Sequence, residues 1–223
     1  RHVAYRALLA QSELPVQWRS HDVTVWMGPR LHVVHYPVRG GEALNIVAIV
    51  QAERPAQSQD WDAAANASAL MHAMGAVSAA NSGAVGPDLM ARLEAVSDWR
   101  QWALHDRAPL TSPHEMAGDR VALLGDAAHP MRPYLAQGAG MAIEDAAVLG
   151  GQLAGAVNTD VPQRLQAFAQ ARWQRNARVQ TRAVRNGEIF HATGPKRVGR
   201  DMGLRWLGAR LMDVPWLYGY RSN

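Results

Sequence analysis

The most informative stretch of this 223-residue chain is GDRVALLGDAAHP, at residues 118–130. The apolar run at residues 120–124 predicts a short, buried parallel strand, and Gly125 would let the backbone turn sharply where that strand ends. Asp126 would then present an ionised carboxylate at the carboxyl end of a sheet. Such a carboxylate suits the hydroxyl groups of a ribose or ribityl chain, because charge-assisted hydrogen bonds are about twice as strong as neutral ones.

A second pattern follows this one, after a loop that contains prolines. It reads QGAGM, at residues 137–141, and a helix is expected to begin near Gly138. Small residues expose backbone N–H groups at a helix N-terminus, which stabilises negative charge, so the segment predicts an anion site. Each piece also has a purely structural interpretation, with Asp126 as an N-cap and the glycines as turn residues. Their occurrence together and in this order favours a binding role.

The residues before the motif are typical of an antiparallel sheet with helices on one face. Strand-like runs separated by turn signals lie at residues 1–10, 22–27, 30–36 and 43–51. Two helices are predicted from composition and spacing at residues 61–80 and 87–96, followed by a short extended piece at 102–109. Beyond Gly155 the chain is mostly helical, with one apolar face that contains Leu165, Phe168, Ala169, Trp173 and Ala177.

Composition excludes several kinds of chemistry. The sequence contains no cysteine, which rules out disulfides, thiolate metal sites and thiol nucleophiles, and makes the cytoplasm the expected compartment. It has no apolar run long enough to span a membrane, and its histidines lack metal-ligand spacing, so neither a membrane nor zinc or iron is expected. Residues 164–210 hold eleven of the 23 basic residues. We interpret them as a solvated helix face that pairs with acidic residues, because no nucleic-acid recognition motif accompanies them.

Residues 125–146, GDAAHPMRPYLAQGAGMAIEDA, resemble the second FAD motif of the class A flavoprotein monooxygenases. That family includes the p-hydroxybenzoate, salicylate, 3-hydroxybenzoate and 6-hydroxynicotinate hydroxylases. Three further stretches are similar to the family: residues 5–8, 31–41 and 216–220. The resemblance implies an α+β fold like that of p-hydroxybenzoate hydroxylase, in which an antiparallel substrate-domain sheet precedes the FAD-motif strand and helices. It also implies that the chain corresponds to the C-terminal half, without the segment that holds the adenine end of FAD.

The resemblance divides the chain into three parts. Residues 1–108 would form part of a substrate-binding domain, residues 109–160 the returning segment of the FAD domain, and residues 161–223 a C-terminal helical region. Asp126 would bind the ribityl chain of FAD. The backbone amides of Gly138, Ala139, Gly140 and Met141 would face the electron-rich edge of the isoalloxazine, where they would stabilise the reduced, anionic flavin.

Other residues receive roles on the same basis. Pro133 would lie beside the part of the flavin ring where oxygen is activated. His32 matches an active-site histidine of the family, and an imidazole is suited to take a proton from a phenolic substrate. Strand periodicity places His32 and Tyr36 on one face and His35 on the other, so His32 and Tyr36 are the substrate-binding candidates. His129 is interpreted as a structural hydrogen-bonding residue.

The predicted function is therefore hydroxylation of a phenolic or hydroxypyridine carboxylate, with FAD as cofactor, NAD(P)H as reductant and oxygen as co-substrate. A homodimer is compatible with the sequence. Two alternatives stay open. The chain could be a truncated module without FAD or activity, because no Gly-x-Gly-x-x-Gly follows a strand. It could also belong to a related flavoprotein that performs epoxidation or simple oxidation. Glu144 and Asp145 are expected to pair with arginines.

Overall fold

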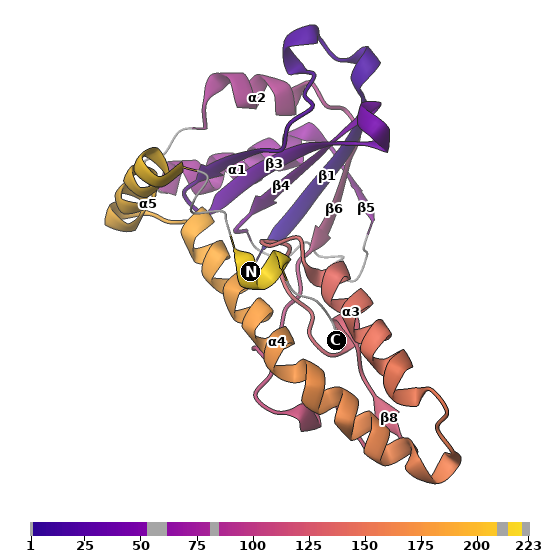
Figure 1. Ribbon diagram of the computed structural model, residues 1–223. Helices are drawn as coiled ribbons and strands as arrows, with labels where there is room; N and C mark the ends of the chain where they lie inside the picture. Colours follow the sequence, from indigo (N-terminus) through magenta and orange to yellow (C-terminus); the bar gives the residue numbers. More distant parts are fainter. Residues whose placement is uncertain (1, 53–61, 81–84, 209–213, 220–223) are drawn as a thin grey trace. The chain divides into compact units, whose positions relative to one another are not determined.

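The computed structural model describes residues 2–52, 62–80, 85–208 and 214–219. The strands are β1 (Val3–Ala10), β2 (Thr24–Gly28), β3 (Leu31–Val38), β4 (Ala43–Val50), β5 (Ala63–Ala65), β6 (Trp99–Ala103), β7 (Ala117–Gly118) and β8 (Val121–Ala122). The helices are α1 (Ala67–Ala80), α2 (Pro87–Glu94), α3 (Gly138–Leu153), α4 (Val161–Phe190), α5 (Gly194–Leu207) and α6 (Pro215–Tyr218). Figure 1 shows these elements.

The chain divides into two compact units. The first consists of residues 1–104 with 189–202, and the second of residues 105–188 with 203–223. The predicted division into three segments, with boundaries after residues 108 and 160, stays a prediction.

The first unit is built on a six-stranded antiparallel sheet with the order β2-β3-β4-β1-β6-β5. The strands β2, β3 and β4 form the predicted meander, and β1 pairs with β4 at its open edge. The turn between β3 and β4 needs Gly40 and Gly41, whose φ angles of 67° and 97° are unfavourable for residues with a Cβ. The predicted antiparallel, α+β class is thus confirmed.

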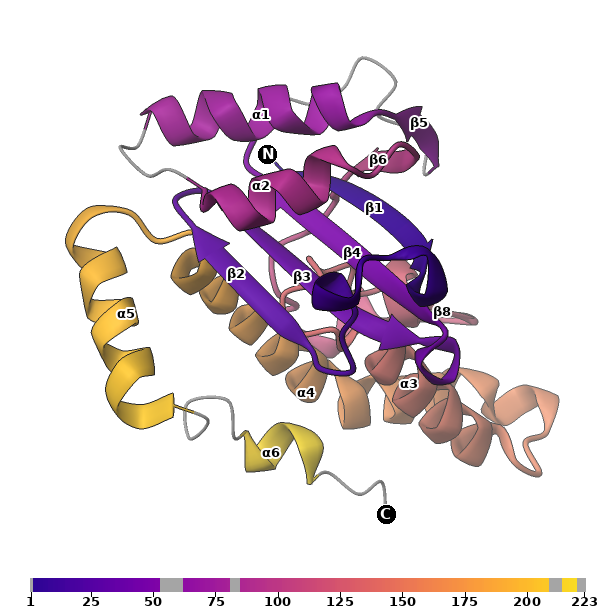
Figure 2. The same cartoon turned by 90° about the horizontal axis from the view of Figure 1, so that it is seen from above.

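Helices α1 and α2 cover one face of this sheet, as the view from above shows (Figure 2). The core between them follows the two-residue period of the strands, because alternate side chains point to the same face. The residues that meet there include Tyr5, Val33, Ile46, Ala48, Leu70, Met74 and Leu93. His32, Val34 and Tyr36 are directed to the opposite face. The sheet therefore separates an apolar core from a second, more polar face.

The second unit contains α3 and most of α4. Leu165, Phe168 and Ala169 of α4 are buried in its core, with Trp173 and Ala177 packed against them. This confirms the apolar face predicted for the helix. Arg172 corrects the prediction of a solvated basic face, because its side chain is fully buried. It occupies the core side of α4, where two carboxylates compensate its charge.

The strand predicted at residues 120–124 is the main error of the sequence-based fold. The structure has instead a two-residue strand, β8, paired antiparallel with β7. Val121 and Leu123 are 64% and 40% exposed, whereas Ala122 and Leu124 are partly buried against the core of the second unit, so the run is buried on one side only. A buried parallel strand needs ladder partners and cover on both faces, and within the described residues β8 pairs only with β7.

Candidate flavin-binding site

Asp126 and the N-terminus of α3 lie next to each other. Gly125 has a φ of 55°, and the turn that it makes carries the exposed carboxylate of Asp126. A Cβ atom placed on Gly138 would be 3.9 Å from Oδ1 of Asp126. The acidic side chain and the glycine-lined helix start are separated in the sequence motif but are therefore adjacent in space. A larger residue at position 138 would narrow the space beside the carboxylate.

The first amides of α3 are directed out of the helix. Helical N–H groups at the first positions have no intrahelical acceptor, and those of Gly138, Ala139 and Gly140 are in this class. Met141 differs, because its N–H already donates to the carbonyl of Gln137 over 2.9 Å, and its side chain is buried. This corrects the prediction that the amide of Met141 contributes. A carboxylate beside three outward amides can hold a ligand that has both hydroxyl groups and a partly negative edge.

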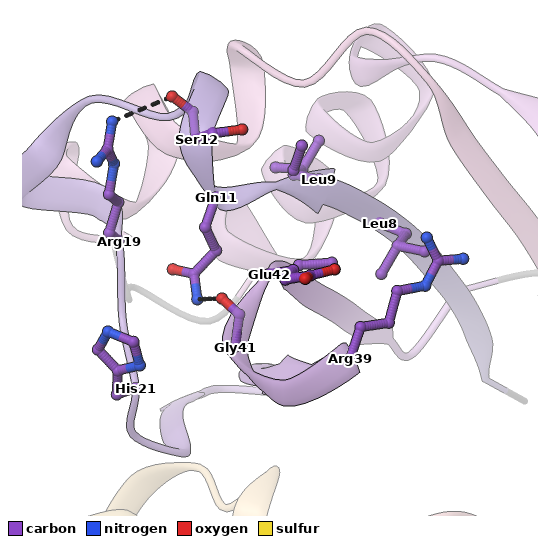
Figure 3. Close-up of a pocket in the computed structure, with 11 residues that line it drawn as sticks. Leu8, Leu9, Gln11, Ser12, Arg19, His21, Arg39, Gly41 and Glu42 are labelled. Atoms are coloured by element: carbon purple, nitrogen blue, oxygen red, sulfur yellow. Dashed lines mark hydrogen bonds between the residues drawn. The ribbon is translucent and has the colours of Figure 1, made fainter.

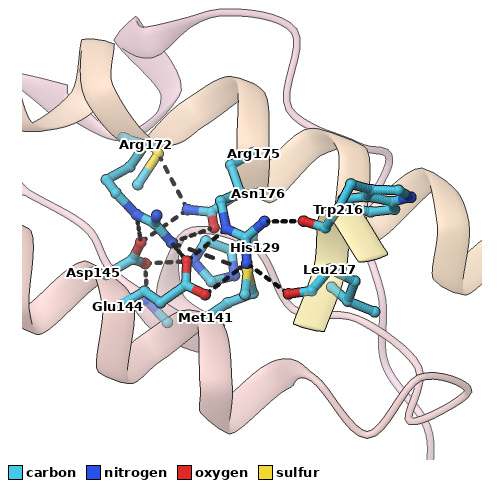
Figure 4. Close-up of polar contacts among 11 residues, drawn as sticks. His129, Met141, Glu144, Asp145, Arg172, Arg175, Asn176, Trp216 and Leu217 are labelled. Atoms are coloured by element: carbon cyan, nitrogen blue, oxygen red, sulfur yellow. Dashed lines mark hydrogen bonds and ion pairs between the residues drawn. The ribbon is translucent and has the colours of Figure 1, made fainter. Parts of the chain in front are cut away.

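A buried polar network supports the turn at Gly125 (Figure 4). Oδ2 of Asp145 accepts a hydrogen bond from the N–H of Gly125 over 3.2 Å and lies 2.6 Å from Nε2 of His129. Its other oxygen accepts from Nε of Arg172 at 2.8 Å and from Nδ2 of Asn176 at 3.0 Å. Asp145, His129, Arg172 and Asn176 are all fully buried. The network joins α3, α4 and the turn, and it confirms His129 as a structural residue.

Arginines of α4 also pair with Glu144, as predicted. Nε and the Nη2 atom of Arg175 each lie 2.7 Å from the carboxylate of Glu144, which also meets Arg172 at 2.8 Å. Arg175 donates further hydrogen bonds to the carbonyls of Trp216 and Leu217 in α6. Figure 4 shows that these groups form one connected set. Burial alone would raise the pKa of Glu144, but hydrogen bonds from Arg175 and the charge of Arg172 outweigh it and lower that pKa.

Pro133 lies in the loop between the turn and α3, and it is exposed. The next residue, Tyr134, is buried and packs against α4 at Gly187, where an added Cβ would be only 2.6 Å from Cε2 of the ring. The side chain of Asn186 donates to the carbonyl of Tyr134 over 3.3 Å. Tyr134 therefore anchors the loop, while Pro133 remains accessible for contact with a ligand.

His32 lies on β3 in the first unit and is buried. Its Nδ1 is 2.8 Å from Nε2 of His191, and its ring packs edge-on against Phe190, with 5.3 Å between centroids. Burial, and to a lesser extent the charge of His191, lowers the pKa of His32 from 6.5 to about 3. His32 is consequently neutral over the physiological range.

Tyr36 lies four residues further along β3 and is half-buried on the same sheet face as His32. It pairs in register with Asn45 of β4. His35 lies on the other face, where its ring meets Trp26 edge-on at 4.8 Å. The sequence-based separation of the two histidines by strand periodicity is thus confirmed.

His191 was not predicted to have a functional role. It follows the end of α4 and contacts a residue 159 positions earlier in the chain. No local pattern links the two segments, since neither periodicity nor motif spacing reports a contact across such a separation. His2 is a further member of this cluster, with its ring centroid 5.2 Å from that of His191.

A separate hollow of about 590 Å³ lies at the end of the sheet in the first unit (Figure 3). Its lining includes Arg19, His21, Arg39 and Glu42, together with Gln11, whose amide donates to the carbonyls of Ser20 and Gly41. None of the predicted site residues lines it.

Within the described residues, no three acidic or histidine side chains are grouped so that they could hold a metal ion. None of the described helices is long and apolar enough to cross a membrane.

An acidic turn beside a glycine-lined helix start is an arrangement that suits a nucleotide cofactor. The chain belongs to the family of FAD binding domains, whose family model matches residues 20–183. This membership confirms the resemblance seen in residues 125–146.

Relatives of known activity agree with this assignment. The 3-hydroxybenzoate 6-hydroxylase of Klebsiella oxytoca is 32% identical, in an alignment that covers 100% of this chain and 53% of that protein. The enzyme of the same name from Polaromonas naphthalenivorans (strain CJ2) is 34% identical over 98% of this chain and 52% of its own length. The chain thus spans about half the length of these curated relatives.

Solved structures show the same fold. A salicylate hydroxylase in complex with its substrate matches 99% of this chain and 54% of its own chain, with 26% sequence identity and a TM-score of 0.76. The 2,6-dihydroxypyridine-3-hydroxylase from Arthrobacter nicotinovorans is 19% identical, with a TM-score of 0.65 over 86% of this chain and 52% of its own. At that identity the second match supports the fold alone.

Proposed function

We propose that this chain is part of an FAD-dependent monooxygenase that hydroxylates a phenolic or hydroxypyridine carboxylate, with NAD(P)H as reductant. The observation that carries the proposal is the juxtaposition of Asp126 with the glycine-lined start of α3. The matches to two hydroxylases of 3-hydroxybenzoate and to one of salicylate support the substrate class. A homodimer and a cytoplasmic location stay predictions.

The residues of the second unit fit FAD. The exposed carboxylate of Asp126 can accept hydrogen bonds from the ribityl hydroxyls. The amides of Gly138, Ala139 and Gly140 can stabilise negative charge on the edge of the isoalloxazine without a basic side chain. Pro133 would contact the ring and help to exclude water from it. When bound, FAD supplies the redox chemistry, taking hydride from NAD(P)H and transferring one oxygen atom of O₂ to the aromatic ring.

The first unit would bind the substrate. His32 would accept the proton of the substrate hydroxyl, which makes the ring more electron-rich and easier to oxygenate. Tyr36, on the same sheet face, would contact the substrate beside it. These two roles rest on the resemblance to the family and on the shared face of β3.

The first experiment measures flavin binding by the full-length gene product. We expect a visible flavin band near 450 nm, roughly, and NADH consumption that accelerates when salicylate or 3-hydroxybenzoate is added. Asp126→Ala should lower flavin content at least tenfold, because a charge-assisted hydrogen bond is lost. The matched control is Asp119→Asn, which alters an exposed aspartate at the start of the same motif and should retain the flavin.

The outcomes separate the alternatives. A colourless full-length protein would defeat the proposal and favour a module without cofactor. A yellow protein that oxidises NADH but leaves every aromatic acid unhydroxylated would favour a related oxidase or epoxidase. The 223-residue chain alone should be colourless, since we expect residues outside it to hold the adenine end of FAD.

A further inference from the structure

Three buried imidazoles form a cluster in the first unit: those of His2, His32 and His191, at 8%, 3% and 8% exposure. His32 comes from β3, His2 precedes β1, and His191 follows α4. The ring centroid of His191 lies 5.1 Å from that of His32 and 5.2 Å from that of His2. The chain thus gathers three proton-binding rings from segments that are far apart in the sequence.

The contact between His32 and His191 is a hydrogen bond with a definite direction. Nδ1 of His32 and Nε2 of His191 are 2.8 Å apart. At this distance one of the two nitrogen atoms must carry a proton and the other must offer a lone pair. If Nδ1 of His32 donates, the second ring nitrogen of His32, Nε2, has the lone pair and can act as a base. If Nε2 of His191 donates instead, Nε2 of His32 carries the proton and cannot act as a base.

To act as a base, His32 would have to take up a proton that its buried position disfavours. Burial holds the pKa of His32 at about 3, whereas a phenol ionises at about 10. A proton that stayed on His32 would therefore be strongly unfavourable. Nε2 of His191, however, lies at hydrogen-bond distance on the other edge of the ring, so His32 can release one proton as it receives another.

We propose that His191 is the proton acceptor behind His32, in a two-histidine relay that serves the proposed hydroxylase and rests on that function. The substrate O–H proton moves to Nε2 of His32, while the proton on Nδ1 of His32 moves to Nε2 of His191. The substrate becomes a phenolate, His32 remains neutral in its other tautomer, and His191 becomes an imidazolium. No proton is gained or lost overall, and the positive charge rests on His191 rather than on His32.

Other charged and titratable groups surround His191. His2 stacks against it, and the N–H of Arg30 donates to its carbonyl over 3.2 Å. Arg200, which pairs with Asp201, donates to the carbonyl of the preceding Phe190 at 2.8 Å. These groups lie close to the place where the relay would put its proton, so the test compares pH profiles between variants rather than relying on one pH value.

The test uses the FAD-loaded full-length protein with His191→Gln. Glutamine can accept the hydrogen bond from Nδ1 of His32 but cannot take up the proton. We expect kcat for a phenolic acid to fall about 100-fold near neutral pH, with KM changed by less than about threefold. The rate should recover as the pH approaches the ionisation of the substrate hydroxyl. A fluorinated substrate whose hydroxyl is already ionised should restore the rate, which a purely structural defect would not allow.

The matched control is His72→Gln, at an exposed histidine of α1, which should leave the rate unchanged.

A second measurement does not depend on turnover or on the stability of a variant. In the wild-type full-length protein, ¹⁵N NMR of labelled histidine should show Nδ1 of His32 protonated and Nε2 of His191 unprotonated. The opposite tautomers would overturn the relay, as would a His191→Gln variant with the wild-type rate and pH profile. If the wild-type protein hydroxylated no phenolic acid, the proposed function itself would fail. If the wild-type protein hydroxylated a phenolic acid and His191→Gln did so at the same rate, only the relay would fail.

Discussion

The backbone N–H of Gly125 donates a hydrogen bond to Oδ2 of Asp145 over 3.2 Å, although the two residues are 20 positions apart in the sequence. Gly125 directly precedes the aspartate proposed to bind FAD. A fully buried carboxylate of α3 thus fixes the backbone from which that aspartate projects. The geometry of the cofactor site therefore depends on a residue that is itself inaccessible to any ligand.

Asp145→Asn should strongly destabilise the second unit. The change removes the negative charge 2.8 Å from Nε of buried Arg172 and leaves that cation with Glu144 alone, a carboxylate that it shares with Arg175. We expect the free energy of unfolding to fall by about 3–5 kcal/mol in a denaturant titration. Asp160→Asn is the control, because Asp160 is 47% exposed and its contact with Arg164 is 3.9 Å long. That change should cost less than about 0.5 kcal/mol, and equal losses in both variants would contradict the role of the network.

Acid should weaken the same network. Burial alone would raise the pKa of Asp145, but hydrogen bonds from His129, Asn176, Arg172 and Gly125 outweigh it and lower that pKa from 3.8 to about 2. Between these two values the unfolded chain binds more protons than the folded chain, so stability falls as the pH falls through this window. About 2 kcal/mol should be present above pH 4 and lost toward pH 2. Denaturant midpoints measured across this range should show the slope, and a variant with asparagine at position 145 should lack that part of it.

Gly187→Ala should disturb the packing of Tyr134. The new methyl group would lie 2.6 Å from Cε2 and 2.8 Å from Cδ2 of the ring, closer than carbon atoms can approach. Overpacking of this kind costs about 1–3 kcal/mol, which exceeds the gain of about 1 kcal/mol from replacing a helical glycine. Gly150→Ala in α3 has open space around it and should instead be stabilising. Thermal unfolding of the two variants should move in opposite directions, and a stabilised Gly187→Ala would show that the contact with Tyr134 is looser than described.

His32 and His35 should respond differently to replacement by leucine. Nε2 of His35 is buried and has no hydrogen-bond partner among the described residues, so His35→Leu removes an unsatisfied polar atom and should change stability by less than about 1 kcal/mol. His32→Leu leaves the buried Nε2 of His191 without the ring that it contacts and should cost about 1–3 kcal/mol. Chemical denaturation distinguishes the two cases. A larger loss for His35→Leu would contradict this account.

Local sequence carried most of the information about the cofactor site. Gly125, Asp126 and Gly138 are recognisable because turn chemistry and helix starts depend on neighbouring residues, and the structure brings them together as expected. The two faces of β3 followed from the two-residue period of a strand. The run at residues 120–124 misled, because its apolar composition does not specify which strands pair with it.

Contacts between residues that are distant in the sequence could not be predicted from it. Arg172 was interpreted as part of a solvated face, since arginine is rarely buried, and only the folded chain shows the two carboxylates that compensate it. His191 was missed for the same reason, because its partner on β3 is 159 residues away. The amide of Met141 was assigned to the ligand although it makes the first backbone hydrogen bond of α3.

The alternation along β3 limits how this strand can evolve. His32 and His35 are three positions apart, so one faces the proposed substrate side and the other the core under α1 and α2. Deleting a single residue within the strand would exchange these sides for every residue beyond the deletion, sending apolar residues outward and polar ones into the core. Losing two residues would preserve the orientation. We therefore expect natural variants of this hairpin to differ in length at the turns, or by even numbers of residues within the strand.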